Sequence, residues 1–325
     1  MEIKIKIKIR KGNEERYFVD FGWGGGIGLA VMNAPQFFSG PLGRFLLVRA
    51  AGLASAALLA GCAASEPRIF TAPAGLQLYS VRDQLAKDVP GTLAEVHSWG
   101  VKYVETAGTY GLTPAQFKAQ LDAQGLDAVS GHFSFEEWSR DPEAVLRQAK
   151  ELGLRYAGCA WIPHSGPFSE EACRQGAEVF NRAGEAAARQ GMHFFYHTHG
   201  YEFQPCADGT LFDLLMRETN PKYVSFQMDI FWVAHAGQDP AKLLEKYPGR
   251  WKLMHLKDMR KGTPTGLLTG SSPETNCVAL GAGQLDLPGI LRAARKAGAE
   301  WYFIEDESPV SEQQIPESLA YLRGL

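Results

Sequence analysis

The chain has 325 residues, of which 45% are hydrophobic and 21% charged, and its formal net charge is −3. This composition is typical of a globular protein, and the near-neutral charge argues against a nucleic-acid binder that relies on a broad basic surface. The five cysteines show no paired zinc-type spacing, and a disulfide framework is not expected in a chain of this length.

Residues 1–31 differ from the rest of the chain. Isoleucine and lysine alternate in MEIKIKIKIR, which predicts an exposed strand with one apolar face. The glycine-rich residues 21–30 are expected to form no regular element, and their glycines do not fit the G-x-G-x-x-G spacing of a dinucleotide site. We interpret residues 1–31 as an N-terminal extension of doubtful origin, with Met32 as the start of the meaningful sequence.

Residues 32–62 have the order of a bacterial export signal. Two arginines precede the apolar run 50–61, which is shorter than the ~20 residues that a membrane-spanning helix needs. The run ends in LAG followed by Cys62, which resembles the lipobox of bacterial lipoproteins and implies lipidation of that cysteine. The alternative is an alanine-rich core helix with a buried Cys62. We expect an exported protein, either anchored to the membrane only through this lipid or periplasmic, with a linker over residues 63–74.

From residue 75 onward, short apolar runs alternate with stretches of helical period. The expected strands cover residues 75–80, 101–106, 126–133, 154–161, 192–199, 222–229, 251–258 and 300–306. The expected helices begin near Val89, Pro114, Pro142, Ser169, Thr210, Pro240, Leu287 and Gln313. This alternation implies parallel strands, and eight such units in residues 75–325 match the size of a (β/α)8 barrel, the TIM barrel. An open doubly wound sheet is the alternative.

Proline and glycine mark the expected helix ends. Three prolines stand just inside a helix, each after a residue that can cap the first turn: Thr113, Asp141 and Asp239. Glycines stand where helices are expected to stop, at Gly100, Gly125, Gly153, Gly191 and Gly298.

Polar side chains end the last four expected strands. His197 and His199 lie at the end of the fifth, Asp229 ends the sixth, His255 lies near the end of the seventh, and Glu305 lies near the end of the eighth. Taken singly, each is more simply a hydrogen-bonded strand-end residue. Because the carboxyl ends of barrel strands surround one pocket, together they predict a divalent-metal site with His197 or His199 as the fourth ligand. Such a donor set suits Zn²⁺, Mn²⁺ or Co²⁺ better than Mg²⁺.

Further side chains are expected around the same pocket. Lys257 points the same way as His255, where it neutralises an oxyanion or forms a salt bridge with a rim carboxylate. Four aromatic side chains are expected on the rim, where they offer faces for a sugar ring or cap the barrel core: Trp161, Trp232, Phe133 and Tyr201. The substrate-binding candidates are Gln77, His132, Trp161, Trp232 and Lys257. The catalytic candidates are Glu305, Glu105, Lys257 and His199. Two loop histidines, His164 and His235, receive no role.

With these residues placed, the chain resembles the sugar phosphate isomerase/epimerase superfamily, the xylose isomerase-like TIM barrels. The matching stretches are LQLYSVRD at 76–83, YVETAG at 103–108, YHTHGYEF at 196–203, DIFWVAHAG at 229–237, GRWKLMHLKD at 249–258 and FIEDE at 303–307. The resemblance implies a metal ion held by strands five to eight, on the same candidate ligands.

One position departs from the superfamily pattern. Its sugar epimerases often carry a metal-bound glutamate on strand five, where this chain has His197. A proton exchange between two metal-bound glutamates therefore does not carry over. Glu305 remains as one base, and the second acid or base is Glu105, Lys257, a histidine or metal-bound water.

The expected function is a divalent-metal-dependent isomerase or epimerase that acts on a sugar or keto-sugar through a metal-stabilised enediolate. One alternative is a dehydratase or β-eliminating lyase on an inosose-like or keto-glycoside substrate. Another is a sugar-binding lipoprotein without turnover. Near-neutral charge and the export signal disfavour the DNA-repair endonucleases of the same fold, and export disfavours a phosphorylated substrate.

The connection 259–283 is expected to act as a lid over the barrel mouth. It is rich in glycine, proline, serine and threonine, and ordinary βα loops have only ~2–6 residues. Closure would exclude water from a reactive intermediate. The alternative is a surface insertion that is not involved in the chemistry.

Replacing Cys62 with serine is predicted to release the protein from the membrane fraction, because the thiol is the expected acylation site. Ultracentrifugation of host extracts measures the distribution, and mass spectrometry of the wild-type N-terminus tests processing. Cys206→Ser serves as the control and should leave membrane association unchanged. A Cys62→Ser variant that stays in the membrane fraction would contradict the prediction.

Overall fold

The computed structural model of the protein describes residues 2–6, 16–23, 26–33 and 68–325. The chain divides into two compact units, Met1–Pro67 and Arg68–Leu325. The described residues of the first unit form a three-stranded antiparallel sheet. Its strands, in order, are β1 (Glu2–Lys6), β2 (Arg16–Trp23) and β3 (Gly26–Asn33).

The strand expected in MEIKIKIKIR is confirmed by β1, but the expectation that residues 21–30 form no regular element is wrong. β2 and β3 pair along their whole length, from Arg16 opposite Asn33 to Trp23 opposite Gly26. Glycine adopts extended backbone readily, and cross-strand hydrogen bonds supply the order that its missing side chain cannot. Most of the expected signal segment, including Cys62, lies outside the described residues. None of the described helices combines the length and the apolar character needed to cross a membrane.

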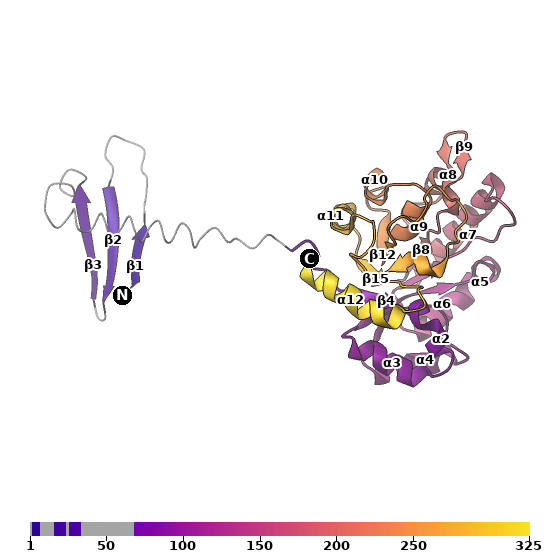
Figure 1. The fold of residues 1–325 in the computed structure, drawn as a ribbon, viewed down its shortest axis with the longest axis horizontal. Coiled ribbons are helices and arrows are strands. Elements are labelled where there is room, and N and C mark those ends of the chain that lie inside the picture. Colours follow the sequence, from indigo (N-terminus) through magenta and orange to yellow (C-terminus); the bar gives the residue numbers. More distant parts are fainter. Residues whose placement is uncertain (1, 7–15, 24–25, 34–67) are drawn as a thin grey trace. The chain divides into compact units, whose positions relative to one another are not determined.

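The second unit is a closed barrel of eight parallel strands, which confirms the TIM-barrel prediction over the doubly wound sheet. The strands follow one another around the ring in chain order, and β15 pairs with β4 to close it. Around the ring they are β4 (Ala74–Gln77), β5 (Tyr103–Thr106), β6 (Asp127–Phe133), β7 (Tyr156–Cys159), β8 (His193–His197), β11 (Val224–Asp229), β12 (Trp251–Leu256) and β15 (Trp301–Ile304). Helices surround the barrel (Figure 1).

The eight expected helices are all present. They are α3 (Val89–Ser98), α4 (Pro114–Ala123), α6 (Pro142–Glu151), α7 (Glu170–Arg189), α8 (Leu211–Glu218), α10 (Pro240–Lys246), α11 (Leu287–Ala297) and α12 (Ser311–Gly324). Three short helices were not expected: α2 (Arg82–Leu85), α5 (Phe135–Arg140) and α9 (Ile230–His235). Each is too short to show the periodicity that identifies a helix in a window of about 11–18 residues.

The predicted helix ends are confirmed. The side chains of the three predicted caps accept backbone N–H groups at 2.9–3.2 Å: Thr113 from Gln116, Asp141 from Ala144, and Asp239 from Ala241. The five predicted stop glycines all have φ between +67° and +88°, in the left-handed region that glycine adopts without steric cost. Each helix therefore ends where the chain must turn into the next strand.

The barrel interior is filled below the mouth. Its inner cluster consists of Val129, Tyr156, Phe195, Leu253 and Phe303. Gly158 of β7 faces this cluster, because a Cβ atom there would lie 2.5 Å from the Phe195 ring. Several members precede a polar strand-end residue by two positions, so period 2 places the polar residues one layer above them. The apolar layer is the floor of the site.

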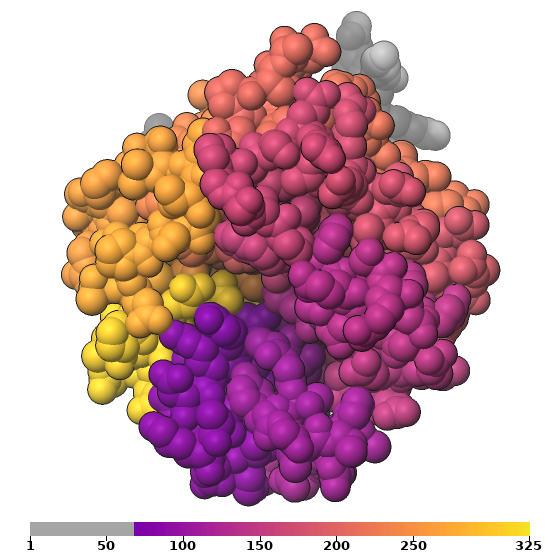
Figure 2. Space-filling model, turned by 90° about the vertical axis from the view of Figure 1, so that its right-hand side faces the viewer, coloured from indigo at the N-terminus to yellow at the C-terminus, as the bar shows by residue number. Residues whose placement is uncertain are grey.

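The barrel unit also includes residues that were expected to be linker. Phe70 is buried against Tyr302, with ring centroids 5.3 Å apart. The backbone N–H of Ile69 donates to the carbonyl of Leu325, at the other end of the unit. Seen from one side, the chain runs around a central hollow, from purple through magenta and orange to yellow (Figure 2).

Candidate metal centre

Four side chains from four neighbouring strands converge at the mouth of the barrel. His197 and Asp229 end β8 and β11, His255 lies in β12, and Glu305 directly follows β15. All four are buried, and one possible ligand atom from each lies within 4.8 Å of the others. His255 Nδ1 lies 3.1 Å from Glu305 Oε2 and 3.9 Å from Asp229 Oδ2. The geometry groups His197, rather than His199, with the other three.

The side chain of Asp229 shows that this cluster fits a cation. Its Oδ1 accepts the N–H groups of Phe231 and Trp232, at 2.8 and 3.1 Å, as the N-cap of α9. Its Oδ2 is buried and has no hydrogen-bond partner among the described residues. A buried carboxylate oxygen without a partner needs a compensating donor or ion. Two imidazoles and two carboxylates make a set that suits Zn²⁺, Mn²⁺ or Co²⁺.

The protonation states of the four side chains differ: His197 and Glu305 are already deprotonated as metal ligands must be, whereas His255, and in part Asp229, would lose a proton when an ion binds. Burial raises the pKa of Asp229 to about 7, although Lys257 opposes this. For Glu305, burial acts in the same direction, but the charges of His255 and Lys257 outweigh it and lower the pKa. Burial lowers the pKa of His255, yet Glu305 and Glu105 together raise it to about 10. Burial holds the pKa of His197 well below its usual value, so that ring is neutral, as a metal ligand must be.

Glu105 lies beneath the cluster and is fully buried. Its Oε1 accepts the Gln77 amide at 2.6 Å and faces His255 Nε2, and its Oε2 accepts Ser130 Oγ at 2.6 Å and the Gln227 amide at 2.8 Å. Burial raises its pKa, but the charges of His132 and His255 prevail and lower it to about 2. A charged carboxylate behind a ligating imidazole orients that ring. The structure thus places Glu105 behind His255 instead of in the substrate cavity.

Gln227 was missed in the sequence. Its Oε1 lies 2.9 Å from His132 Nε2 and 3.1 Å from His197 Nδ1, so both rings can donate to one amide oxygen. This arrangement leaves His197 Nε2 available for an ion. The period-2 pattern that points Asp229 inward does the same for Gln227, and this signal could have identified it.

Lys257 lies beside the cluster and does not line the cavity above it. Its Nζ lies 2.6 Å from Glu307 and 3.6 Å from Glu305, and 4.9 Å from the centre of the Trp232 ring. Burial lowers its pKa, but Glu305 and Glu307 raise it well above the usual value. The side chain is therefore a cation that balances two carboxylates.

A cavity of about 260 Å³ opens above the cluster. It is lined by Gln77, Tyr79, Ala107, His132, Ala160, Trp161, His197, His199, Trp232, Gly270, Glu305 and Glu307. Four of the five substrate-binding candidates are therefore on its wall, and Lys257 is the exception. The Nδ1 atom of His199 is buried there without a partner among the described residues, and burial lowers the pKa of His199 to about 3.

Glu202 positions His199 and was also missed. Its buried carboxylate accepts the backbone N–H of His199 at 3.0 Å and the Tyr196 hydroxyl at 2.6 Å. Tyr196 in turn lies 2.7 Å from the hydroxyl of Tyr201, which is buried instead of lying on the rim. Nothing in the spacing of Glu202 distinguishes it from an exposed loop residue, because it follows the strand end by five positions.

The connection 259–283 reaches the cavity through Gly270. A Cβ atom at Gly270 would lie 3.0 Å from the Tyr201 ring and 3.1 Å from Trp161. At its base, Asp258 accepts the N–H groups of Gly281 and Gly283, both at 3.0 Å. Further along, Glu274 pairs with Arg82 at 2.6 Å, which ties the connection to the segment after β4. The described contacts place the expected lid at the edge of the cavity, and its closure stays a prediction.

A closed parallel barrel with this His, Asp, His and Glu cluster at its mouth defines the class as a TIM barrel with a candidate divalent-metal centre. The chain belongs to the xylose isomerase-like TIM barrel family, whose family model matches residues 93–325.

Named proteins of similar sequence or structure support the family assignment. The chain is 36% identical over 155 residues to inosose dehydratase 1 of Bacillus cereus, covering 46% of this chain and 51% of that protein. It thus spans about half the length of the curated relatives it matches. A sugar phosphate isomerase/epimerase from Parabacteroides distasonis ATCC 8503 has a TM-score of 0.63 and 25% identity, covering 79% of this chain and 95% of that one. The IOLI protein with a binding zinc atom shares the fold, with a TM-score of 0.57, 14% identity and coverage of 78% and 95%.

Replacing Asp229 with asparagine is predicted to weaken metal binding by more than about 100-fold, since loss of an outer-shell partner alone typically costs about 10–100-fold. Metal content after dialysis and a chelator competition titration measure the effect, and circular dichroism checks the fold. His132→Gln is the matched control, because His132, His197 and His255 form a competing three-histidine cluster. Loss of metal in His132→Gln with retention in Asp229→Asn would assign the ion to the histidines instead.

Replacing residues 264–272 with a glycine-serine segment of equal length is predicted to lower turnover at least about tenfold while metal content stays unchanged, if closure excludes water from the site. The change removes the part that contains Gly270 and keeps the anchors at Asp258 and Glu274. Steady-state kinetics measure the effect. Unchanged kinetics on the true substrate would show that the connection is only a surface insertion.

Proposed function

We propose that the protein is a divalent-metal-dependent enzyme that isomerises or epimerises a sugar or keto-sugar by removing a proton next to its carbonyl group. The observation that carries the proposal is the buried cluster of His197, Asp229, His255 and Glu305 at the floor of a 260 Å³ cavity. The family and the names of its relatives support a sugar-like substrate.

A bound ion would polarise the carbonyl and neighbouring hydroxyl oxygens and so stabilise negative charge that develops on them. Other residues of the chain hold the candidate metal-ligating atoms in place for this role. Glu105 orients the ring of His255 through Nε2, and Gln227 orients His197 through Nδ1. Lys257 adds positive charge next to Glu305. These contacts fix the metal-ligating atoms before the substrate binds. Such preorganisation favours electrostatic stabilisation of the negative charge that develops on the substrate.

Removal of a proton from the substrate requires an acid or base whose side chain faces the cavity. His199 meets this requirement, because its ring lines the cavity. Glu305 also lines the cavity and is the second candidate. Glu105 lacks access to the cavity, and Lys257 is held by two carboxylates. We therefore assign the proton transfers to His199 and Glu305.

Dehydration is the second candidate reaction, and the similarity to inosose dehydratase 1 favours it. It shares the first step, the removal of a proton next to a carbonyl. A β-hydroxyl group then leaves as water, and the electron pair of the broken C–H bond forms a C=C bond. The same cluster supports both reactions, and the product distinguishes them.

Export, to a membrane-anchored or periplasmic location, remains part of the proposal. The order of charged residues, apolar run and LAG before Cys62 supports it. In that setting the substrate would be an unphosphorylated sugar, since sugar phosphates are mostly cytosolic.

The metal-loaded protein is predicted to exchange deuterium from D₂O into the carbon next to the carbonyl of an inosose or keto-sugar. Replacing His199 with glutamine should slow this exchange by about 10²–10⁴-fold, the usual contribution of a general acid or base, with metal content retained. NMR follows the exchange, and absorbance of an enone product reports elimination.

His193→Gln is the matched control, because His193 begins the strand that His197 ends and lies far from the cavity along β8. Metal binding and sugar binding without any exchange would instead favour the non-catalytic sugar-binding lipoprotein.

A further inference from the structure

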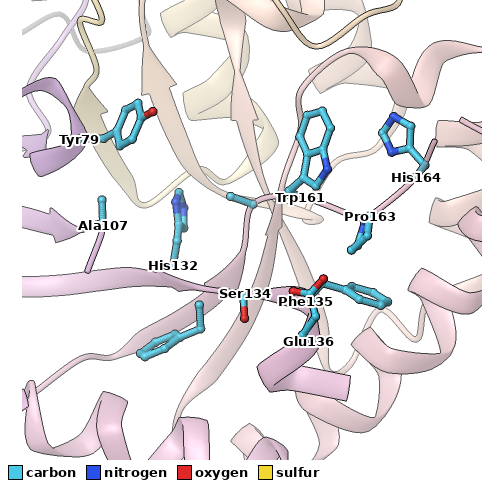
Figure 3. Close-up of a pocket in the computed structure, with 11 residues that line it drawn as sticks. Tyr79, Ala107, His132, Ser134, Phe135, Glu136, Trp161, Pro163 and His164 are labelled. Atoms are coloured by element: carbon cyan, nitrogen blue, oxygen red, sulfur yellow. The ribbon is translucent and has the colours of Figure 1, made fainter. Parts of the chain in front are cut away.

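A second cavity of about 630 Å³ adjoins the one above the candidate metal centre. The two share five lining residues: Tyr79, Ala107, His132, Ala160 and Trp161. The larger cavity extends from them over the loops that follow β6 and β7, with Phe135, Glu136 and His164 on its wall (Figure 3). The two cavities are therefore neighbours at the barrel mouth, and one ligand can contact residues of both.

The volumes decide how much ligand each cavity can hold. The 260 Å³ of the metal cavity lies below the range of about 300–1,000 Å³ that is usual for complete small-molecule sites. It fits one sugar ring. The 630 Å³ of the second cavity lies well inside that range. A free monosaccharide bound at the metal centre would leave this larger space filled only by water.

The charges of the lining residues indicate which kind of group the second cavity can bind. Among the described residues that line the two cavities there is no lysine or arginine. Lys257 is buried outside both and is paired with Glu307, and the wall of the second cavity carries the carboxylate of Glu136. Phosphate groups are normally held by arginine or lysine. The second cavity therefore suits a neutral group.

The aromatic side chains point to the kind of neutral group. Tyr79 and Trp161 lie on opposite sides of the cavity (Figure 3), and their side chains are 42% and 39% exposed. Trp161 is held from behind by stacking on His164, at 5.1 Å between ring centroids, and by an edge contact with Tyr201 at 4.6 Å. Trp161 is thus a rigid exposed ring that offers a flat apolar face at little entropic cost, whereas one face of Tyr79 is covered by the Arg82 guanidinium, 4.4 Å from the ring centre. The apolar face of a pyranose ring matches that of Trp161, and the Glu136 carboxylate can bind the hydroxyl groups of the ring.

We propose that the second cavity is a subsite for a second pyranose ring, so that the substrate is a neutral keto-disaccharide and not a free or phosphorylated monosaccharide. This rests on the proposed function, in which the keto-bearing ring occupies the metal cavity. The second ring then packs on Trp161 and extends toward Glu136 and His164, and the glycosidic linkage passes His132 and Ala160, which line both cavities.

The test compares pairs of probes on the metal-loaded full chain: keto-disaccharides with α or β linkages, and the methyl glycosides of the same keto-sugar rings. Each pair has the same reacting ring and linkage and differs only in the second ring. Isothermal titration calorimetry measures affinity, and deuterium exchange from D₂O measures reactivity. We expect at least one disaccharide to bind about tenfold more tightly than its methyl glycoside, and Trp161→Ala to abolish this preference, which is taken as the ratio of the two affinities because Trp161 also lines the metal cavity.

Trp161→Phe is the matched control and should restore most of the preference, because it keeps an aromatic face. The proposal is overturned if no pair shows a preference, or if Trp161→Ala weakens both members of a pair equally. The proposed function fails separately, if the disaccharide binds with the expected preference but no probe exchanges or reacts.

Discussion

The buried carboxylate of Glu105 is the interaction on which the site depends. Both of its oxygens are occupied, by donors from four other strands: Gln77 on β4, Ser130 on β6, Gln227 on β11 and His255 on β12. A carboxylate taken out of water costs several kcal/mol unless such donors compensate it. Because those donors are supplied only by a closed barrel in the correct register, closure of the fold and placement of His255 are linked.

Glu105 and Glu305 both contact His255, but they have different roles. Glu105 and Glu305 face opposite ring nitrogens of His255, one from below the site and one from the cavity side. The first has no access to the cavity and can only orient the ring, whereas the second lines the cavity. The unpartnered Oδ2 of Asp229 lies on the same side as Glu305, 3.9 Å from His255 Nδ1. Charge compensation is thus complete beneath the histidine and incomplete above it, which is where a cation fits.

The sequence was sufficient to predict the barrel because each unit shows its own local signals. Alternating apolar runs gave the strands, and positions such as Asp141 and Gly153 gave helix ends within a residue or two. The metal cluster was predictable for the same reason, since strand ends of a barrel meet at one mouth. Local signals did not identify α5, because it is too short to show a helical period. They also did not identify β3, because its glycines obscure the strand pattern. They also could not show that Glu105 faces away from the cavity, because that depends on packing across the barrel.

The first four and the last four strands of the barrel contribute to different parts of the site. The four-residue metal cluster comes from β8, β11 and β12 and from the residue after β15, whereas the second cavity is built by residues at or after the ends of β4, β5, β6 and β7. The contact between Glu105 of β5 and His255 of β12 joins the two halves under the floor of the site. Loops after the first four strands can therefore change length and composition without moving a ligand atom. In such a fold the strands determine the reaction and the loops determine which substrate reaches it. Exposed aromatic residues such as Trp161 belong to the second group, and their identity carries more information about the substrate than the metal cluster does.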